Sequence, residues 1–191
     1  MKKRILSLAL SAAMALTMLP TGAFAASDKG KPPVYNKATG CYEISTPDQL
    51  LYLSGSWRDG APRDGHYVLT ADIDMTGVKG FKPIASKKDQ GFTGTFDGQF
   101  HAIKGLRVEY EKKYAGLFGY VGNQDDQAYI KDVALLDCYV TGQQNVGALA
   151  GVNYGTITGC VVTGEVKCLD LSNSHTAGGI CGKLKEGEGP I

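Results

Sequence analysis

The chain has 191 residues, and its 20 Lys or Arg against 19 Asp or Glu give a formal net charge of +1. The only basic runs after the first residues are Lys87-Lys88 and Lys112-Lys113, so composition argues against a nucleic-acid-binding protein or a membrane-surface binder. Twenty-six glycines without a collagen period favour many short strands joined by tight turns.

The first 25 residues have the pattern of a signal peptide. A basic start at Lys2–Arg4 precedes the apolar run Ile5–Leu19, and Ala23–Ala25 is a small-x-small cleavage site. The apolar run is short for a membrane span and is followed by Pro20 and a polar tract. We therefore predict a secreted or cell-surface protein, cleaved after Ala25 and without membrane insertion after signal removal.

Residues 26–40 are predicted to be a flexible leader, because they hold Pro32-Pro33 among Lys, Gly and Asp. An N-terminal cap is predicted over residues 41–65, with a short strand at Cys41–Ser45 and then a helix to about residue 57. Thr46 and Gln49 form a capping box around Pro47, which suits the first helical position. The apolar face of this helix is expected to comprise Leu50, Leu51, Leu53 and Trp57.

From His66 onward the pattern becomes strand-like, and residues 66–191 are predicted to form one β-solenoid. The segments 92–96 and 101–108 are two candidate strands joined through the tight-turn dipeptide Asp97-Gly98. After Tyr114 strands follow at regular spacing.

A motif that runs from a small or β-branched residue and Gly to a large aliphatic residue and a second Gly occurs three times, in Tyr114–Val121, Asn145–Val152 and Thr176–Leu184. Its first shared glycines, Gly116, Gly147 and Gly178, lie 31 residues apart both times. A second strand of the repeat opens at Ile130 and Ile157, only 27 residues apart, so the order of strands repeats while the loops vary in length. This is the behaviour of a solenoid. We expect equivalent apolar residues to stack: Leu117, Leu149 and Ile180, Val133 with Cys160, and Leu135 with Val162.

The segments Phe92–Gly98 and His101–Leu106 resemble the region that precedes GLUG repeats in bacterial surface proteins. Ala115–Gly119 and Val146–Gly151 are similar to GLUG motifs themselves, and Thr70–Gly77 is also typical of that family. The resemblance covers roughly residues 44–184. It implies an all-β, right-handed parallel β-helix-like solenoid in large exported proteins, including accessory regions of IgA-specific metallopeptidases and adhesins. It implies no catalytic motif. Because a repeat has only just begun when the sequence ends, we expect the solenoid to continue beyond Ile191.

Few residues offer a pattern for catalysis or metal binding. Asp72 and Asp74 could contribute to a calcium site, although such acids are more often solvated, and Asp125-Asp126 lacks EF-hand spacing. The histidines (His66, His101 and His175) are scattered, without an H-E-x-x-H motif, and His101 is expected to make a local hydrogen bond. A weaker alternative is polysaccharide cleavage by clustered acids and bases, of which the nearest candidates are Asp72, Asp74, Asp97, Lys104 and Arg107. We predict no catalytic, cofactor-binding or metal-binding residue, and no cofactor.

Five cysteines in an exported chain leave two interpretations open. Two disulfides are possible in many pairings, but the sequence favours free, packed thiols, since Cys160 and Cys181 fall at repeat positions held elsewhere by apolar residues. The others are Cys41, Cys138 and Cys168.

Tyrosines near strand ends could contact a glycan or a host or cell-surface protein, although such rings more often cover the edges of coils. They are Tyr110, Tyr114, Tyr120, Tyr129, Tyr139 and Tyr154. The sequence thus predicts a non-catalytic display, adhesion or recognition scaffold of an exported bacterial surface protein. The alternative is an accessory region of a larger secreted enzyme, a peptidase or polysaccharide-active, whose catalytic part lies outside this chain.

Overall fold

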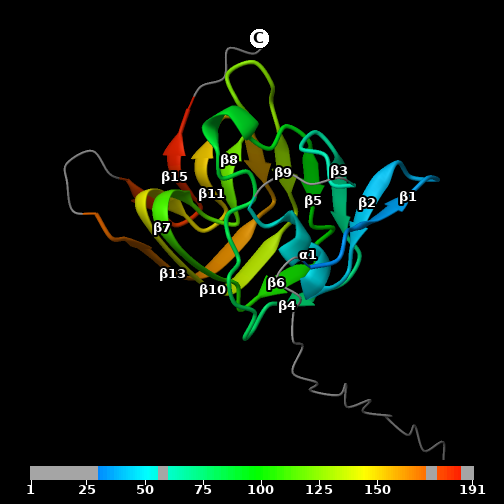
Figure 1. Cartoon of the computed structure of the whole chain (residues 1–191), viewed down its shortest axis with the longest axis horizontal. Helices are drawn as coiled ribbons and strands as arrows, with labels where there is room; N and C mark the ends of the chain where they lie inside the picture. The colour runs from blue at the N-terminus through cyan, green and yellow to red at the C-terminus, as the bar shows by residue number, and fades with distance from the viewer. Residues whose placement is uncertain (1–29, 56–59, 171–175, 186–191) are drawn as a thin grey trace, which may run out of the picture.

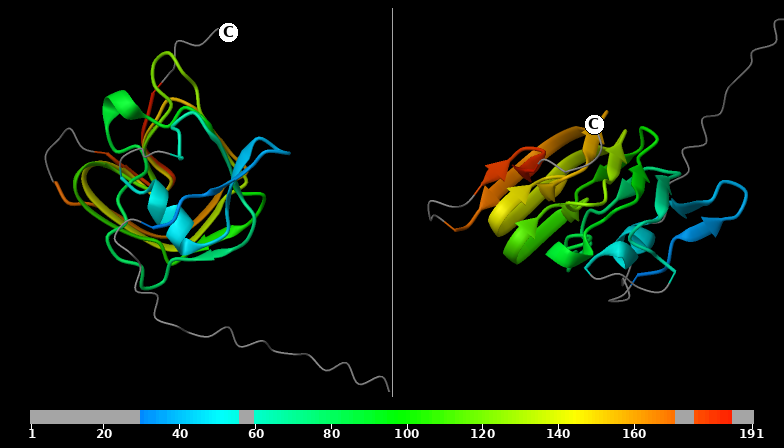
Figure 2. Two further views of the ribbon diagram at one scale, coloured as in Figure 1. Left: turned by 45° about the vertical axis from the view of Figure 1, so that its right-hand side comes forward. Right: turned by 90° about the horizontal axis from the view of Figure 1, so that it is seen from above.

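The chain winds into a β-solenoid of about four coils, most of whose strands are parallel (Figure 1). The computed structural model describes residues 30–55, 60–170 and 176–185. Seen from above, the coils stack side by side from the N-terminal helix to the last strand (Figure 2). The predicted all-β parallel solenoid with one short α-helix is confirmed within the described residues.

Three sheets run along the solenoid. The first contains β1 (Val34–Asn36), β2 (Cys41–Ile44), β3 (His66–Leu69), β5 (Thr95–Asp97), β9 (Tyr129–Lys131) and β12 (Thr156–Thr158). The second contains β4 (Ile73–Asp74), β6 (Ala102–Lys104), β7 (Arg107–Ala115), β10 (Ala134–Gly147), β13 (Val161–Cys168) and β14 (Ala177–Gly178). The third contains β8 (Phe118–Val121), β11 (Ala150–Asn153) and β15 (Cys181–Leu184).

Equivalent residues of successive coils lie opposite one another, as the repeat predicts. Leu135 pairs with Ile103 on one side and Val162 on the other, and Gly147 pairs with Gly178. In the third sheet Ala150 lies between Phe118 and Cys181. The side chains that point inward therefore form ladders along the solenoid axis.

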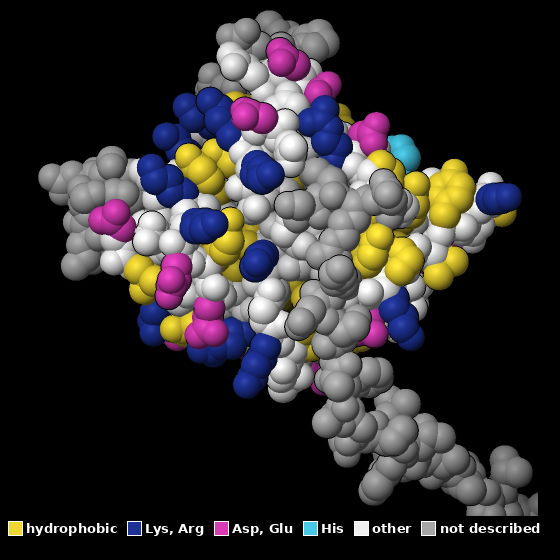
Figure 3. Space-filling model, viewed as in Figure 1, with side chains coloured by type: hydrophobic (Ala, Val, Ile, Leu, Met, Phe, Trp, Pro, Cys, Tyr) yellow, Lys and Arg dark blue, Asp and Glu magenta, His cyan; other side chains and the backbone are white. Residues whose placement is uncertain are grey.

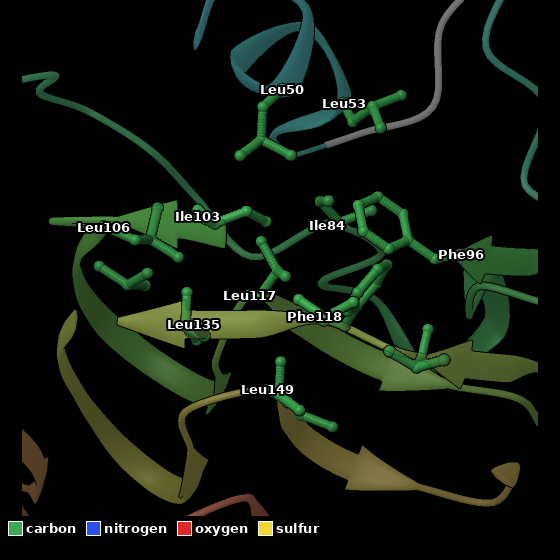
Figure 4. Close-up of a cluster of buried hydrophobic side chains, with 14 of the residues drawn as sticks. Leu50, Leu53, Ile84, Phe96, Ile103, Leu106, Leu117, Phe118, Leu135 and Leu149 are labelled. Carbon is green, nitrogen blue, oxygen red and sulfur yellow. The ribbon is translucent and has the colours of Figure 1, made fainter. Parts of the chain in front are cut away.

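These ladders make up the core. Leu117, Leu135 and Leu149 are fully buried and converge with Ile103 and Phe118 in the space between the sheets (Figure 4). Stacked side chains of this kind stabilise a coil through its neighbours rather than through contacts within the coil.

The corners between sheets use left-handed backbone at equivalent positions. Asp132 (φ 54°) and Gly159 (φ 61°) occupy one corner of the third and fourth coils, and Phe100 (φ 63°) occupies that corner of the second. Tyr114 (φ 69°) and Asn145 (φ 51°) occupy another corner, two residues before the repeated glycine. Residues with a Cβ pay a steric cost in this conformation, so the corners are places of local strain.

Helix α1 (Pro47–Leu53) lies over the N-terminal end of the core. The expected capping box is present: the Thr46 side chain accepts from the Gln49 amide, and the Gln49 side chain accepts from the Thr46 amide. Leu50 and Leu53 point from the helix toward Ile84 and Phe96 of the core (Figure 4). The helix ends at Leu53, earlier than the expected residue 57, and Trp57 lies outside the described residues.

Part of the expected flexible leader is a strand, which corrects the sequence interpretation of residues 26–40. Val34–Asn36 forms β1 and pairs antiparallel with β2. The pairing is supported by a hydrogen bond from Asn36 Nδ2 to Glu43 Oε1 (2.7 Å) and by contact between the rings of Tyr35 and Tyr42, whose centroids are 4.9 Å apart. These contacts form only once β2 is in place, so the polar composition of the leader did not reveal them.

The Asp97-Gly98 turn is a corner between two sheets. The strand before it, β5, belongs to the first sheet, and the strand after it, β6, belongs to the second. Asp97 Oδ1 accepts a hydrogen bond from the Gln99 amide (2.9 Å), and both Gln99 and Phe100 have positive φ. The dipeptide therefore bends the chain within one coil.

Candidate functional site

The acids proposed for calcium binding, Asp72 and Asp74, already accept hydrogen bonds within the protein. Asp72 Oδ1 accepts from the amide of Ala102 (2.9 Å) and lies 3.1 Å from Nδ1 of His101. Asp74 Oδ1 accepts from the amide of Thr76 (2.9 Å). The Ala102 amide, and then His101, lower the pKa of Asp72, and Thr76 lowers the pKa of Asp74. His101 makes a hydrogen-bonding contact with Asp72 of a neighbouring coil, so Asp72 links two coils, whereas Asp74 holds a turn.

The remaining members of the predicted acid and base cluster pair with other partners. Asp97 forms an ion pair with Lys131 (2.8 Å), which holds the lysine pKa above its usual value. Arg107 forms one with Glu109 (2.7 Å). Lys104 lies opposite Asp74 in the second sheet, whereas Asp97 belongs to the first. Asp72, Asp74 and Lys104 thus lie near one another, whereas Asp97 and Arg107 pair with residues outside the predicted cluster.

Asp125 and Asp126 lie in a loop organised by Asn123. Asn123 Oδ1 accepts from the amides of Asp125 (2.8 Å) and Asp126 (2.7 Å). In the described part of the chain, no group of three or more His, Cys, Asp or Glu side chains is placed to hold a metal ion. His66 is exposed at the start of β3, and His175 lies outside the described residues.

All five cysteines are free thiols in the structure. Cys138 is buried in the second sheet, and Cys160 and Cys181 are half-buried in the fourth coil. Burial raises the pKa of these three thiols above the ordinary cysteine value. A raised pKa keeps them protonated at neutral pH and therefore poor nucleophiles.

The candidate recognition tyrosines differ in their surroundings. Tyr120 is buried against Tyr114, with ring centroids 4.6 Å apart, and burial raises its pKa, so it is a packing residue and not an exposed contact. Tyr129 is 49% exposed on β9. Tyr139 is half-buried on β10, with Arg107 Cζ 4.2 Å and Lys167 Nζ 5.3 Å from its ring centroid.

A groove of about 1100 Å³ runs along β7 and is here named the β7 groove. Consecutive residues of β7, from Glu109 to Tyr114, form one wall. The segment between β4 and β5 contributes the opposite wall with Lys82, Ser86 and Lys87. The lining is completed by Gly55, Tyr139, Thr141 and Leu169.

The groove exists because β7 pairs on one edge only. It pairs with β10, and no other described strand pairs with it. The preceding coil has only the short β4 at this level, followed by irregular chain. The register between β7 and β10 also shifts where Tyr110–Lys113 opposes Gly142–Gln144, which places one extra residue in β7. A bulge of this kind turns successive side chains of β7 toward the groove.

The lysines of the groove are exposed and come from distant parts of the sequence. They are Lys82, Lys87, Lys112 and Lys113. No ion pair within residues 30–55, 60–170 and 176–185 involves any of the four. Figure 3 shows Lys and Arg side chains gathered on the part of this face that lies over β7 in Figure 1. The sequence had shown two Lys-Lys runs but not that they meet, and those runs were the available signal.

Comparisons with known proteins found sequence similarity to parts of two long proteins. The sequence matches no family model. It is 32% identical over 151 residues to "Halomucin" of Haloquadratum walsbyi, a match that covers 74% of this chain and 2% of that protein. It is 33% identical over 101 residues to a "Putative Gly-rich membrane protein" of Evansella cellulosilytica, covering 48% of this chain and 11% of that protein.

Among solved structures, a "putative immunoglobulin A1 protease" from Bacteroides ovatus aligns with 76% of this chain and 62% of its own, at 18% identity and a TM-score of 0.40. No helix of the described residues is long and apolar enough to cross a membrane. The chain thus spans a small fraction of the curated relatives that it matches, and is a β-solenoid with similarity to segments of two much longer proteins.

Proposed function

We propose that this chain is part of an exported bacterial surface protein and serves there as a non-catalytic scaffold for display, adhesion or recognition. The observation that carries the proposal is that inward and outward side chains have different surroundings. Aliphatic residues form the inward ladders, the candidate catalytic acids are held in hydrogen bonds and ion pairs, and outward residues remain available for contacts.

The relatives agree with such a role. This chain aligns with only 2% of the length of halomucin and 11% of the second relative, which is named as a membrane protein. A solenoid can form a unit within a long protein because each coil needs only its neighbours for burial. The partner would be a glycan or a host or cell-surface protein.

Localisation tests the first half of the proposal. The full chain with a C-terminal epitope is produced in a secreting bacterium, and the medium, intact cells and cell contents are probed separately. We expect the epitope outside the cell, on a protein that begins at Ala26. The matched control is the double variant Ala23→Asp with Ala25→Asp, which removes the small residues of the cleavage site and should keep the uncleaved form. An unprocessed wild-type chain confined to the cell contents would contradict export.

Turnover assays test the second half. The purified chain is incubated with acidic and neutral polysaccharides and with immunoglobulin A, and the products are separated by size. We expect all substrates to stay intact. Cleavage of any of them that is lost in Asp97→Asn with Lys104→Gln would contradict a non-catalytic role.

A further inference from the structure

We propose that the β7 groove binds an acidic polysaccharide, through its four lysines and its tyrosine rings. This inference rests on the recognition role proposed above, and it names the site and the chemical class of the ligand.

The groove is elongated along a strand and open to solvent. Six consecutive residues of β7 line it, so its length follows the strand and suits a chain-like ligand. The free edge of β7 adds backbone amides and carbonyls that have no strand partner among the described elements.

The charge of the lining favours an anion. Lys82, Lys87, Lys112 and Lys113 outnumber Glu109 and Glu111, and Glu109 is already paired with Arg107. A cleft lined mainly by one sign of charge focuses the field and attracts the opposite sign. Ammonium groups without an ion-pair partner in the described chain are available for carboxylate or sulfate groups.

The other side chains of the lining favour a polysaccharide over a nucleic acid. Tyr110, Tyr114 and Tyr139 are half-buried and present a ring together with a hydroxyl. The carboxylate of Glu111 can accept hydrogen bonds from sugar hydroxyls but would repel a continuous phosphate backbone. A mixed lining of this kind fits a ligand that alternates charged and hydroxyl groups.

A structural explanation for the same lysines predicts a different outcome. Charged residues, lysine above all, protect the free edge of a strand from pairing with a second molecule. If protection is their only role, replacing Lys112 and Lys113 causes association of the chain and leaves ligand binding unchanged.

The test is calorimetric titration of the full chain with polygalacturonate at low salt, with dextran as the neutral probe and a short DNA duplex as the competing anion. The variant is Lys112→Gln with Lys113→Gln. The matched control, Lys37→Gln with Lys185→Gln, removes the same charge from exposed lysines outside the groove. We expect polygalacturonate to bind, dextran not to bind, and the groove variant to bind roughly fivefold to tenfold more weakly than the control. Size-exclusion chromatography of both variants reports association.

Three results would overturn the inference. They are no binding of polygalacturonate by the wild-type chain, equal binding by the groove and control variants, and tighter binding of the DNA duplex than of polygalacturonate at the same salt. The localisation experiment has its own readout, so a chain that is exported but does not bind refutes the groove and not the surface role.

Discussion

The third and fourth coils carry the same residue pattern in different surroundings. Leu149 of the third coil is fully buried, whereas the equivalent Ile180 of the fourth coil is 43% exposed. Leu135 is buried and its partner Val162 is half-buried. The third coil has a coil on both sides, and no described element covers the far side of the fourth. Neighbouring coils therefore bury the aliphatic residues of the repeat. How much such a residue contributes to the free energy of unfolding depends on its position along the solenoid axis.

The largest test of this comparison is to shorten equivalent side chains in the two coils. Leu149→Ala should lower the free energy of unfolding by about 3 kcal/mol, because it leaves a cavity in a closed core. Ile180→Ala should cost less than about 1 kcal/mol, because its side chain is partly in water already. Urea denaturation of both variants measures the difference. Equal losses would show that the fourth coil is as well packed as the third.

The repeated glycines allow a second test. A Cβ on Gly147 would fall on the backbone of the next coil, 2.6 Å from the amide nitrogen of Gly182, whereas a Cβ on Gly179 would meet nothing within 4 Å. Gly147→Ala should therefore destabilise the protein by about 2 kcal/mol through overpacking. Gly179→Ala should stay within about 0.5 kcal/mol of the wild type. Thermal unfolding followed by circular dichroism compares them, and a Gly147→Ala protein as stable as the wild type would refute the close approach of the coils.

A corner residue serves as a third test. Its effect on the free energy of unfolding depends on its own backbone conformation and not on neighbouring coils. Phe100 has φ 63° and its side chain is 82% exposed, so it pays a conformational cost without gaining burial. Phe100→Gly should stabilise the protein by about 0.5 kcal/mol, after allowing for the greater freedom of glycine in the unfolded chain. Phe100→Ala, which keeps a Cβ, should bring no such gain. Denaturant midpoints measure both, and a loss of stability in Phe100→Gly would mean that the ring has a packing role.

The sequence predicted those parts of the fold that depend on residues close together in the chain. The spacing of Gly116, Gly147 and Gly178 gave the register of the coils, and Thr46 with Gln49 gave the start of α1. Asp132 and Asn145 stand at left-handed corners, where short polar side chains are common, so these corners too had a signal.

The parts that the sequence did not predict depend on contacts between distant segments. The pairing of β1 with β2 needs the ring of Tyr42 beside Tyr35, and Tyr120 is buried only because Tyr114 covers it. The β7 groove depends on a missing partner strand and on the bulge near Lys112, and it joins Lys82 to lysines about 30 positions later in the chain. The residue pattern of a single strand does not show whether a second strand will pair with its free edge.

Amide hydrogen exchange, followed by mass spectrometry on the full chain, tests most directly whether each coil is protected by its neighbours. Peptides from β10 and β11 should exchange much more slowly than the equivalent peptides from β13 and β15, because terminal repeats open at lower free energy than interior ones. Equal protection of the third and fourth coils would contradict the account.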